Sequence, residues 1–167
     1  MAEPDRAGLA QLCLRLHEQL RRREETLAVA ESLTGGLVSA TLTETAGASQ
    51  TFRGGLVVYA TDLKASLAGV SEELLARRGA VDPQVAIELA RGVRGRLGAS
   101  WGVGVTGVAG PDRQDGREVG TVFLGVAGPR AAGETVCELQ LSGERNSIRR
   151  QTVEHVVNLL LDRTAPA

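Results

Sequence analysis

The chain has 167 residues, enough to form one domain with a sizeable apolar core. Its formal net charge is -1, and its longest basic run is Arg21, Arg22 and Arg23, so we expect no nucleic-acid partner. Aromatic residues make up only 2% of the chain, which also argues against a protein that stacks unpaired bases.

Helical and strand patterns alternate from the start of the chain. Apolar residues between positions 9 and 20 recur at steps of three and four, which predicts an amphipathic helix. The run TLAVA (26–30) predicts a buried strand. It breaks at Glu31 and Ser32 into the turn LTGG, and a second helix is predicted from Leu37 to Glu44.

The next strand and helices follow a polar loop. The alternating run GGLVVYAT (54–61) predicts a strand, and Asp62 is expected to cap the short helix that carries Lys64. Ser71 is expected to cap a further helix. Asp82 is expected to cap another, with a proline at its first position.

The second half of the chain predicts three strands and a closing helix. ASWGVGVTG (99–107) reads as a glycine-rich strand, and the segments 119–128 and 134–141 read as two strands joined by a short connection. A helix is predicted from about Glu144 to Asp162. The alternation favours an α/β layered fold, and the adjacent strand pair makes a purely parallel sheet unexpected.

No targeting, membrane or metal-binding pattern is present. The sequence begins MAEPDRAG, unlike a signal peptide, and contains no apolar run of 18 residues, so we expect a cytoplasmic protein without a membrane partner. Cys13 and Cys137 lie in unrelated segments without CxxC spacing. We expect both to be buried and no metal to be bound.

Ser32 is the first candidate catalytic residue. Ligands of α/β sheets gather beyond the carboxyl ends of the strands, where 32–36, 59–64 and 106–111 are expected to lie. A serine entering a helix there could act as a nucleophile, with an oxyanion held by N–H groups of the turn. Helix capping is the alternative role. His17 and His155 lie in amphipathic helices and are interpreted as structural, so a Ser-His-Asp arrangement is not expected.

Lys64 is the candidate base. It is the only lysine among 19 basic residues, and a lysine, unlike an arginine, can lose its proton when it is buried. A neutral Lys64 could accept the proton of Ser32, as in serine-lysine variants of the triad. Tyr59 could orient that amine, or it could simply pack in the strand.

Two anion-binding patterns are weaker. The loop GVTGVAGP follows a strand, but it lacks both the Walker lysine and the dinucleotide fingerprint. Arg145 and Arg149 are four residues apart and could form an anion clamp or a solvated basic face.

Together these segments resemble the C-terminal domain of the CinA competence/damage-inducible proteins, whose stand-alone members are nicotinamide mononucleotide deamidases. The residues that carry the resemblance are AESLTGG (30–36), GGLVVYATDLKASLAGV (54–70), VTGVAGP (105–111), VGTVFLGV (119–126) and GERNSIRRQTVEHVVNLLL (143–161).

The resemblance implies one domain over residues 1–167, a three-layer α/β/α sandwich with a mixed, mostly parallel sheet. It also implies a homodimer that needs no cofactor or metal and deamidates nicotinamide mononucleotide through a serine-lysine mechanism. Ser32 would be the nucleophile, Lys64 its base and Tyr59 a helper. The implied substrate contacts are Thr34, Gly35, Gly36, Thr106, Gly107, Ala109, Gly110 and Arg145.

The sequence departs from the family pattern in two places. Leu33 stands where the family usually has a cysteine, and the loop 111–118 differs from the usual one. The nucleophile and base are unaffected, but the loop could bind its substrate differently. A nucleotide-binding module without catalysis, or a partner-binding domain in competence or DNA damage, stays open as an alternative.

Overall fold

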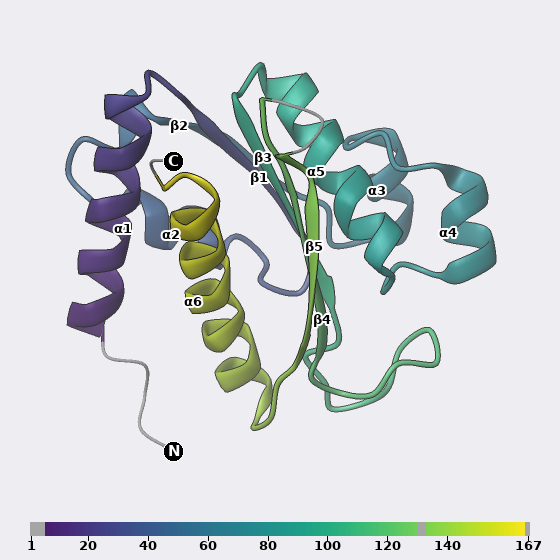
Figure 1. Cartoon of the computed structure of the whole chain (residues 1–167). Helices are drawn as coiled ribbons and strands as arrows, with labels where there is room; N and C mark the ends of the chain where they lie inside the picture. The colour runs from purple at the N-terminus through teal and green to yellow at the C-terminus, as the bar shows by residue number, and fades with distance from the viewer. Residues whose placement is uncertain (1–5, 130–132, 166–167) are drawn as a thin grey trace.

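The predicted alternation of helices and strands is present in the computed structural model, which describes residues 6–129 and 133–165 (Figure 1). The elements in chain order are α1 (Arg6–Arg22), β1 (Leu27–Glu31), α2 (Leu37–Thr43), the 3-10 helix η1 (Ala48–Gln50), β2 (Phe52–Val57), α3 (Thr61–Ser66), α4 (Glu72–Arg78), α5 (Pro83–Leu97), β3 (Trp101–Gly107), β4 (Thr121–Ala127), β5 (Thr135–Gln140) and α6 (Arg145–Arg163).

The described residues form one five-stranded sheet in the order β2-β1-β3-β4-β5. β1 is parallel to both β2 and β3, whereas β4 is antiparallel to both β3 and β5. Four strands therefore point the same way, which agrees with the predicted mixed, mostly parallel sheet. Glu31 at the end of β1 is level with Val57 of β2 and Val105 of β3, so these three strands end at one edge of the sheet.

Helices cover both faces of this sheet. α1, α2 and α6 lie on one face, and α3, α4 and α5 lie on the other (Figure 1). The alternation of β1 divides its side chains between two cores: Leu27 and Val29 pack under the first group of helices, and Ala28 and Ala30 pack under the second. The three-layer α/β/α sandwich is confirmed.

Small residues on the second face let α5 pack directly on the strand backbones. A side chain at Gly104 of β3 would place its Cβ 2.2 Å from the carbonyl oxygen of Ala86 in α5. This close approach is the physical reason for the glycine-rich pattern that the sequence shows in β3.

Two of the three predicted helix caps are present. The Ser71 hydroxyl accepts a hydrogen bond from the Leu74 N–H, and the Asp82 carboxylate accepts one from the Gln84 N–H. The prediction for Asp62 was wrong: the N-cap of α3 is Ala60, two residues earlier, and it has no side-chain cap. Asp62 lies instead in the first turn, where an acidic charge favours the helix dipole.

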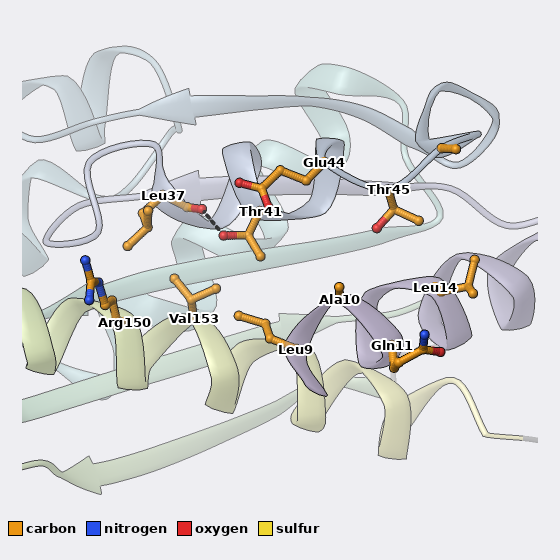
Figure 2. Close-up of a pocket in the computed structure, with 11 residues that line it drawn as sticks. Leu9, Ala10, Gln11, Leu14, Leu37, Thr41, Glu44, Thr45, Arg150 and Val153 are labelled. Atoms are coloured by element: carbon orange, nitrogen blue, oxygen red, sulfur yellow. Dashed lines mark hydrogen bonds between the residues drawn. The ribbon is translucent and has the colours of Figure 1, made fainter. Parts of the chain in front are cut away.

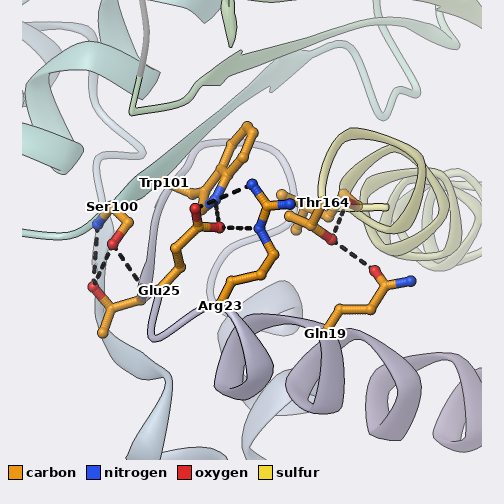
Figure 3. A network of polar contacts seen from close by, with 8 residues as sticks. Gln19, Arg23, Glu25, Ser100, Trp101 and Thr164 are labelled. Atoms are coloured by element: carbon orange, nitrogen blue, oxygen red, sulfur yellow. Dashed lines mark hydrogen bonds and ion pairs between the residues drawn. The ribbon is translucent and has the colours of Figure 1, made fainter. Parts of the chain in front are cut away.

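Hydrogen bonds connect the starts of β1 and β3, at the sheet edge opposite the carboxyl ends of these strands (Figure 3). The Glu25 carboxylate accepts hydrogen bonds from the Trp101 indole at 2.7 Å and from Arg23 at 2.8 Å. Burial by itself raises the pKa of Glu25, but these two donors outweigh it and the pKa is lowered. Thr26 and Ser100 exchange backbone-to-hydroxyl hydrogen bonds beside this cluster.

The cysteines differ in their surroundings. Cys13 lies on α1 and is buried. Burial, with a smaller effect of Glu44, raises the pKa of its thiol to about 11. Cys137 is only partly buried on the edge strand β5, so the expectation that both are buried was wrong for this residue. Over residues 6–129 and 133–165, no helix is long and apolar enough to cross a membrane.

Candidate active site

The candidate site lies where β1, β2 and β3 end together. Ser32 follows β1 directly, and its N–H donates to the Val105 carbonyl at 3.0 Å. On the other side, the Val58 N–H donates to the Glu31 carbonyl at 2.8 Å. Ser32 is therefore held between the ends of the two neighbouring strands, and its side chain is partly exposed. No group in the described part of the chain hydrogen-bonds to its hydroxyl.

Lys64 brings an amine to this same edge. It lies on α3, is only 2% exposed, and its Nζ donates to the carbonyls of Val58 at 2.9 Å and Tyr59 at 3.2 Å. Val58 and Tyr59 immediately follow β2, which neighbours the strand that leads into Ser32. The amine is thus anchored to the backbone beside the strand that carries the serine.

Burial changes the acidity of this amine. It lowers the pKa of Lys64 from 10.5 to about 8, although the carboxylates of Asp115 and Asp62 oppose the shift. Removing an ammonium group from water is costly, and Lys64 is one of the largest fully buried side chains of the protein. The neutral amine, which can accept a proton, is therefore accessible near neutral pH.

Tyr59 is not a strand residue. β2 ends two residues earlier, at Val57, and the Tyr59 ring is 54% exposed, so the alternative of an aromatic packed in the sheet was wrong. Its hydroxyl accepts a hydrogen bond from Arg145 at 2.5 Å, and the same guanidinium donates to the Gly110 carbonyl at 2.6 Å. Three predicted site residues from distant segments are thus brought together at the start of α6.

The turn after Ser32 has fewer free donors than expected. The Gly35 N–H donates to the Ser32 carbonyl at 3.0 Å, and the Gly36 N–H donates to the Glu31 carboxylate at 3.0 Å. Within the described ranges, the N–H groups of Leu33 and Thr34 have no acceptor. Of the turn from Leu33 to Gly36, which was expected to supply oxyanion donors, two N–H groups are therefore already occupied.

Glu31 is a site residue that the sequence reasoning missed. Its buried carboxylate accepts four hydrogen bonds: from the N–H groups of Gly36, Val38 and Ser39 and from the Ser39 hydroxyl. It therefore occupies the start of α2, where we had expected an open site for an anion. A carboxylate at the end of a buried apolar strand needs hydrogen-bond donors around it. An acidic residue directly after such an apolar run is therefore the sequence pattern that would have revealed the role of Glu31.

The predicted arginine pair separates in the structure. Arg145 is exposed and lies over Tyr59, whereas Arg149 is half-buried and donates to the carbonyls of Leu33 at 3.0 Å and Thr34 at 2.7 Å. Arg149 therefore does not form the anion clamp with Arg145, because its guanidinium binds two carbonyls of the Ser32 turn and the Asn146 side chain. Only Arg145 remains as the predicted contact for an anionic substrate.

The remaining predicted contacts differ in burial and in hydrogen bonding. Thr34 is fully buried and its hydroxyl has no hydrogen-bond partner, whereas the buried Thr106 hydroxyl donates to the Ala80 carbonyl at 2.7 Å. Gly107 and Ala109 are also buried, and Gly110 and Gly35 are more accessible. Substrate contacts by these residues stay predictions.

The divergent loop 111–118 is attached through Asp115 to the segment between α4 and α5. Its carboxylate accepts hydrogen bonds from the N–H groups of Ala80 at 2.8 Å and Val81 at 3.2 Å. Gly79 makes this possible, because a Cβ there would lie 2.5 Å from the Asp115 carboxyl carbon. Since Asp115 also acts on the pKa of Lys64, the loop influences the candidate base electrostatically.

Neither histidine takes part in the site. His17 is buried between α1 and α2, where Nε2 donates to the Leu42 carbonyl at 2.9 Å and Nδ1 accepts from the Thr51 hydroxyl at 2.6 Å. His155 is exposed on α6. Their interpretation as structural residues agrees with these positions.

A separate groove of about 700 Å³ lies between α1, α2 and α6 (Figure 2). Leu9, Leu14, Leu37 and Val153 supply much of its apolar lining, with Arg150 near one end. None of the predicted site residues lines this groove. The candidate site is therefore defined by its hydrogen bonds and its buried amine rather than by this groove.

Comparison with known sequences gives one family. Residues 9–164 match the family model described as the CinA C-terminal domain. A CinA-like protein from Frankia casuarinae is 50% identical over 141 residues, which are 84% of this chain and 32% of that protein. A CinA-like protein from Acidobacterium capsulatum is 45% identical over 142 residues, 84% of this chain and 34% of that protein. The chain thus spans about a third of the length of these curated relatives.

Solved structures share the fold. A competence/damage inducible protein from Agrobacterium tumefaciens has a TM-score of 0.90 and 32% identity, with 99% of each chain covered. A CinA superfamily protein from Enterobacter cloacae has a TM-score of 0.89 and 29% identity, covering 94% of this chain and 92% of that one. The arrangement of layers and strands described above is therefore shared with these two proteins.

Proposed function

Because the chain belongs to the CinA C-terminal domain family, we propose that it is an amidohydrolase that converts nicotinamide mononucleotide to nicotinate mononucleotide and ammonia. The observation that carries the proposal is the buried amine of Lys64, with its pKa lowered to about 8, at the sheet edge where Ser32 follows β1. A charged group is rarely buried without a reason, and a lysine that titrates near neutral pH is suited to act as a base.

Lys64 is suited to take the proton of Ser32. A neutral amine has two hydrogens and one lone pair, and the carbonyls of Val58 and Tyr59 accept two hydrogen bonds from Nζ. The lone pair is then free to accept the hydroxyl proton. With a pKa near 8, about a tenth of the amine is neutral at pH 7.

The reaction proceeds in two stages. Ser32 Oγ attacks the carboxamide carbon as its proton passes to Lys64, and the N–H groups of Leu33 and Thr34 hold the oxyanion, at about 3 kcal/mol for each donor. The protonated Lys64 then gives its proton to the leaving nitrogen, and ammonia departs from the acyl-enzyme. Lys64 then takes a proton from water, which attacks the ester; the protonated amine returns this proton to the leaving Ser32 Oγ, so the acid is released and both side chains are restored.

Arg145 supports a phosphorylated substrate. Two of its nitrogens are bound by Tyr59 and Gly110, and among the described residues no carboxylate forms an ion pair with it. No carboxylate therefore neutralises its positive charge beside Tyr59 and Gly110, and its remaining N–H groups can bind a phosphate. Tyr59 holds the guanidinium in place through its hydroxyl and receives Lys64 through its carbonyl.

Ammonia release from a panel of amides tests the proposal. Nicotinamide mononucleotide, nicotinamide riboside and nicotinamide would be offered to the wild type, to Ser32→Ala and Lys64→Arg, and to Ser49→Ala as a control at an exposed serine of η1. We expect the wild type and Ser49→Ala to release ammonia from the mononucleotide, and from the riboside with a higher KM, whereas Ser32→Ala and Lys64→Arg release none. Binding without ammonia release would indicate a non-catalytic nucleotide-binding module, and an absence of both would favour a partner-binding domain.

The contact with the phosphate is tested separately. Arg145→Ala is expected to raise the KM for nicotinamide mononucleotide while leaving the KM for the riboside unchanged. An equal effect on the two substrates would remove Arg145 from the phosphate site.

A further inference from the structure

Arg149 forms hydrogen bonds to the turn that follows the candidate nucleophile. Its Nε donates to the Leu33 carbonyl at 3.0 Å and one terminal nitrogen donates to the Thr34 carbonyl at 2.7 Å. The other terminal nitrogen donates to the Asn146 side chain at 3.3 Å, within the same helix. All three guanidinium nitrogens therefore have partners, and two of them bind successive peptide groups beside Ser32.

These two hydrogen bonds fix more than the two carbonyls. In a trans peptide the C=O of one residue and the N–H of the next are coplanar and point in opposite directions. Holding the Leu33 carbonyl therefore directs the Thr34 N–H away from Arg149. Holding the Thr34 carbonyl likewise orients the Gly35 N–H, which donates to the Ser32 carbonyl at 3.0 Å.

The Ser32 carbonyl extends this chain of constraints by one peptide. It shares a plane with the Leu33 N–H, so the hydrogen bond from Gly35 also fixes the direction of that donor. Arg149 thus orients both N–H groups that have no acceptor. It orients that of Thr34 directly, through the Leu33 carbonyl, and that of Leu33 indirectly, through the hydrogen bond from Gly35 to the Ser32 carbonyl.

The turn is held from its other end by Glu31, whose carboxylate binds the N–H groups of Gly36, Val38 and Ser39. The two charged side chains divide the turn between them. Glu31 occupies the donors at the start of α2, and Arg149 occupies the carbonyls nearer to Ser32. What remains unoccupied is the pair of N–H groups adjacent to the serine.

We propose that Arg149 is a positioning residue of the amidase reaction, which acts by aiming the Leu33 and Thr34 N–H groups at the oxyanion and does not touch the substrate. This inference rests on the proposed function, because it assumes that an oxyanion forms at Ser32. An arginine is required for this role, since its planar fork spans two carbonyls at once, whereas a lysine offers a single point charge.

Kinetics of three variants test the proposal. Arg149→Met removes the donors but keeps a long side chain, Arg149→Lys keeps the charge, and Arg150→Met is the control at the next, exposed position of α6. We expect Arg149→Met to lower kcat about 100-fold with KM nearly unchanged, since oxyanion donors act in the transition state. Arg149→Lys should lose about 10-fold, because it reaches only one carbonyl, and Arg150→Met should behave as the wild type.

Two kinetic outcomes would overturn the proposal. A raised KM for the mononucleotide with kcat unchanged would make Arg149 a phosphate ligand, and the riboside would then be unaffected by the change. A lower melting temperature with unchanged kcat would make it a structural residue only. The proposal requires the same fall in kcat for both substrates.

Hydrogen exchange supplies a measurement that does not depend on turnover. In Arg149→Met the Gly35 amide is expected to exchange about tenfold faster, because the Thr34 carbonyl of the same peptide group is no longer held, while amides of β3 keep their rates. Unchanged exchange at Gly35 would overturn the positioning role. If the wild type released no ammonia from any amide, the proposed function would fail, and the exchange result would still decide whether Arg149 orders the turn.

Discussion

Replacing Lys64 with methionine should make the protein more stable at neutral pH and inactive. Lys64 has a folded-state pKa of about 8 against an ordinary 10.5, so its charged form is disfavoured on folding by about 3 kcal/mol. The side chain is only 2% exposed, so solvent screens this cost very little. Methionine removes it but forfeits two hydrogen bonds, to Val58 and Tyr59, at about 1 kcal/mol each. The net gain at pH 7 is about 1 kcal/mol.

The pH dependence gives the sharper result. Below pH 8 the amine is charged in both the folded and the unfolded state, and the folded state bears the full cost. Between pH 8 and 10.5 the folded protein loses the proton that the unfolded chain keeps, so wild-type stability rises by about 3 kcal/mol relative to Lys64→Met. The variant is therefore expected to be the more stable at pH 7 and the less stable at pH 10.5.

Urea unfolding followed by the fluorescence of Trp101, the only tryptophan, measures both proteins from pH 7 to 10.5. The difference between the two free energies of unfolding cancels every group except Lys64. Lys64→Arg serves as the control that keeps a charge but cannot titrate in this range. A difference that stays constant with pH would show that the amine is not desolvated, and the assignment of Lys64 as a base would lose its support.

Three further predictions concern the surroundings of the site. Burial lowers the pKa of His17, and nearby Arg21 also lowers it, against an opposing hydrogen bond to Leu42. Stability should therefore fall as the pH drops below about 6.5, and urea titrations of His17→Gln should show a smaller loss. Thr34→Val replaces a buried hydroxyl that has no partner, so the free energy of unfolding should rise by about 1 kcal/mol, and a raised KM would instead indicate a substrate contact. Asp115→Asn removes a charge that raises the pKa of Lys64, so the pH profile of ammonia release should move to lower pH; a move to higher pH would contradict this.

Much of the fold could be predicted from local sequence. The short apolar run of β1 and the helical period of α1 reflect the burial of these elements, and the side-chain caps at Ser71 and Asp82 depend on residues two or three positions away. The end of β2 was less predictable. Apolar residues continue through Val58, but the chain leaves the sheet there to offer carbonyls to Lys64.

The composition of the site was predictable only where a residue was chemically unusual. The single lysine stood out, and the structure buries it beside the strand that leads to Ser32. The roles of Glu31 and Arg149 depend on backbone groups that converge only in the folded protein. Arg145 and Arg149 share a helical spacing in the sequence, yet one guanidinium binds the Tyr59 hydroxyl and the other binds the Thr34 carbonyl.

The last helix links the hydrophobic interior to the chemistry proposed at Ser32. Ile148 is fully buried next to Arg149 on α6, and about three further turns of mostly apolar buried side chains, down to Leu160, pack the helix against the sheet. The position of the Arg149 guanidinium therefore depends on how tightly these buried side chains of α6 pack against the sheet. Removing one methyl group from this buried core, far from any ligand, would displace Arg149 and thereby change kcat. Substitutions at these buried apolar positions therefore belong in a mutational study of turnover.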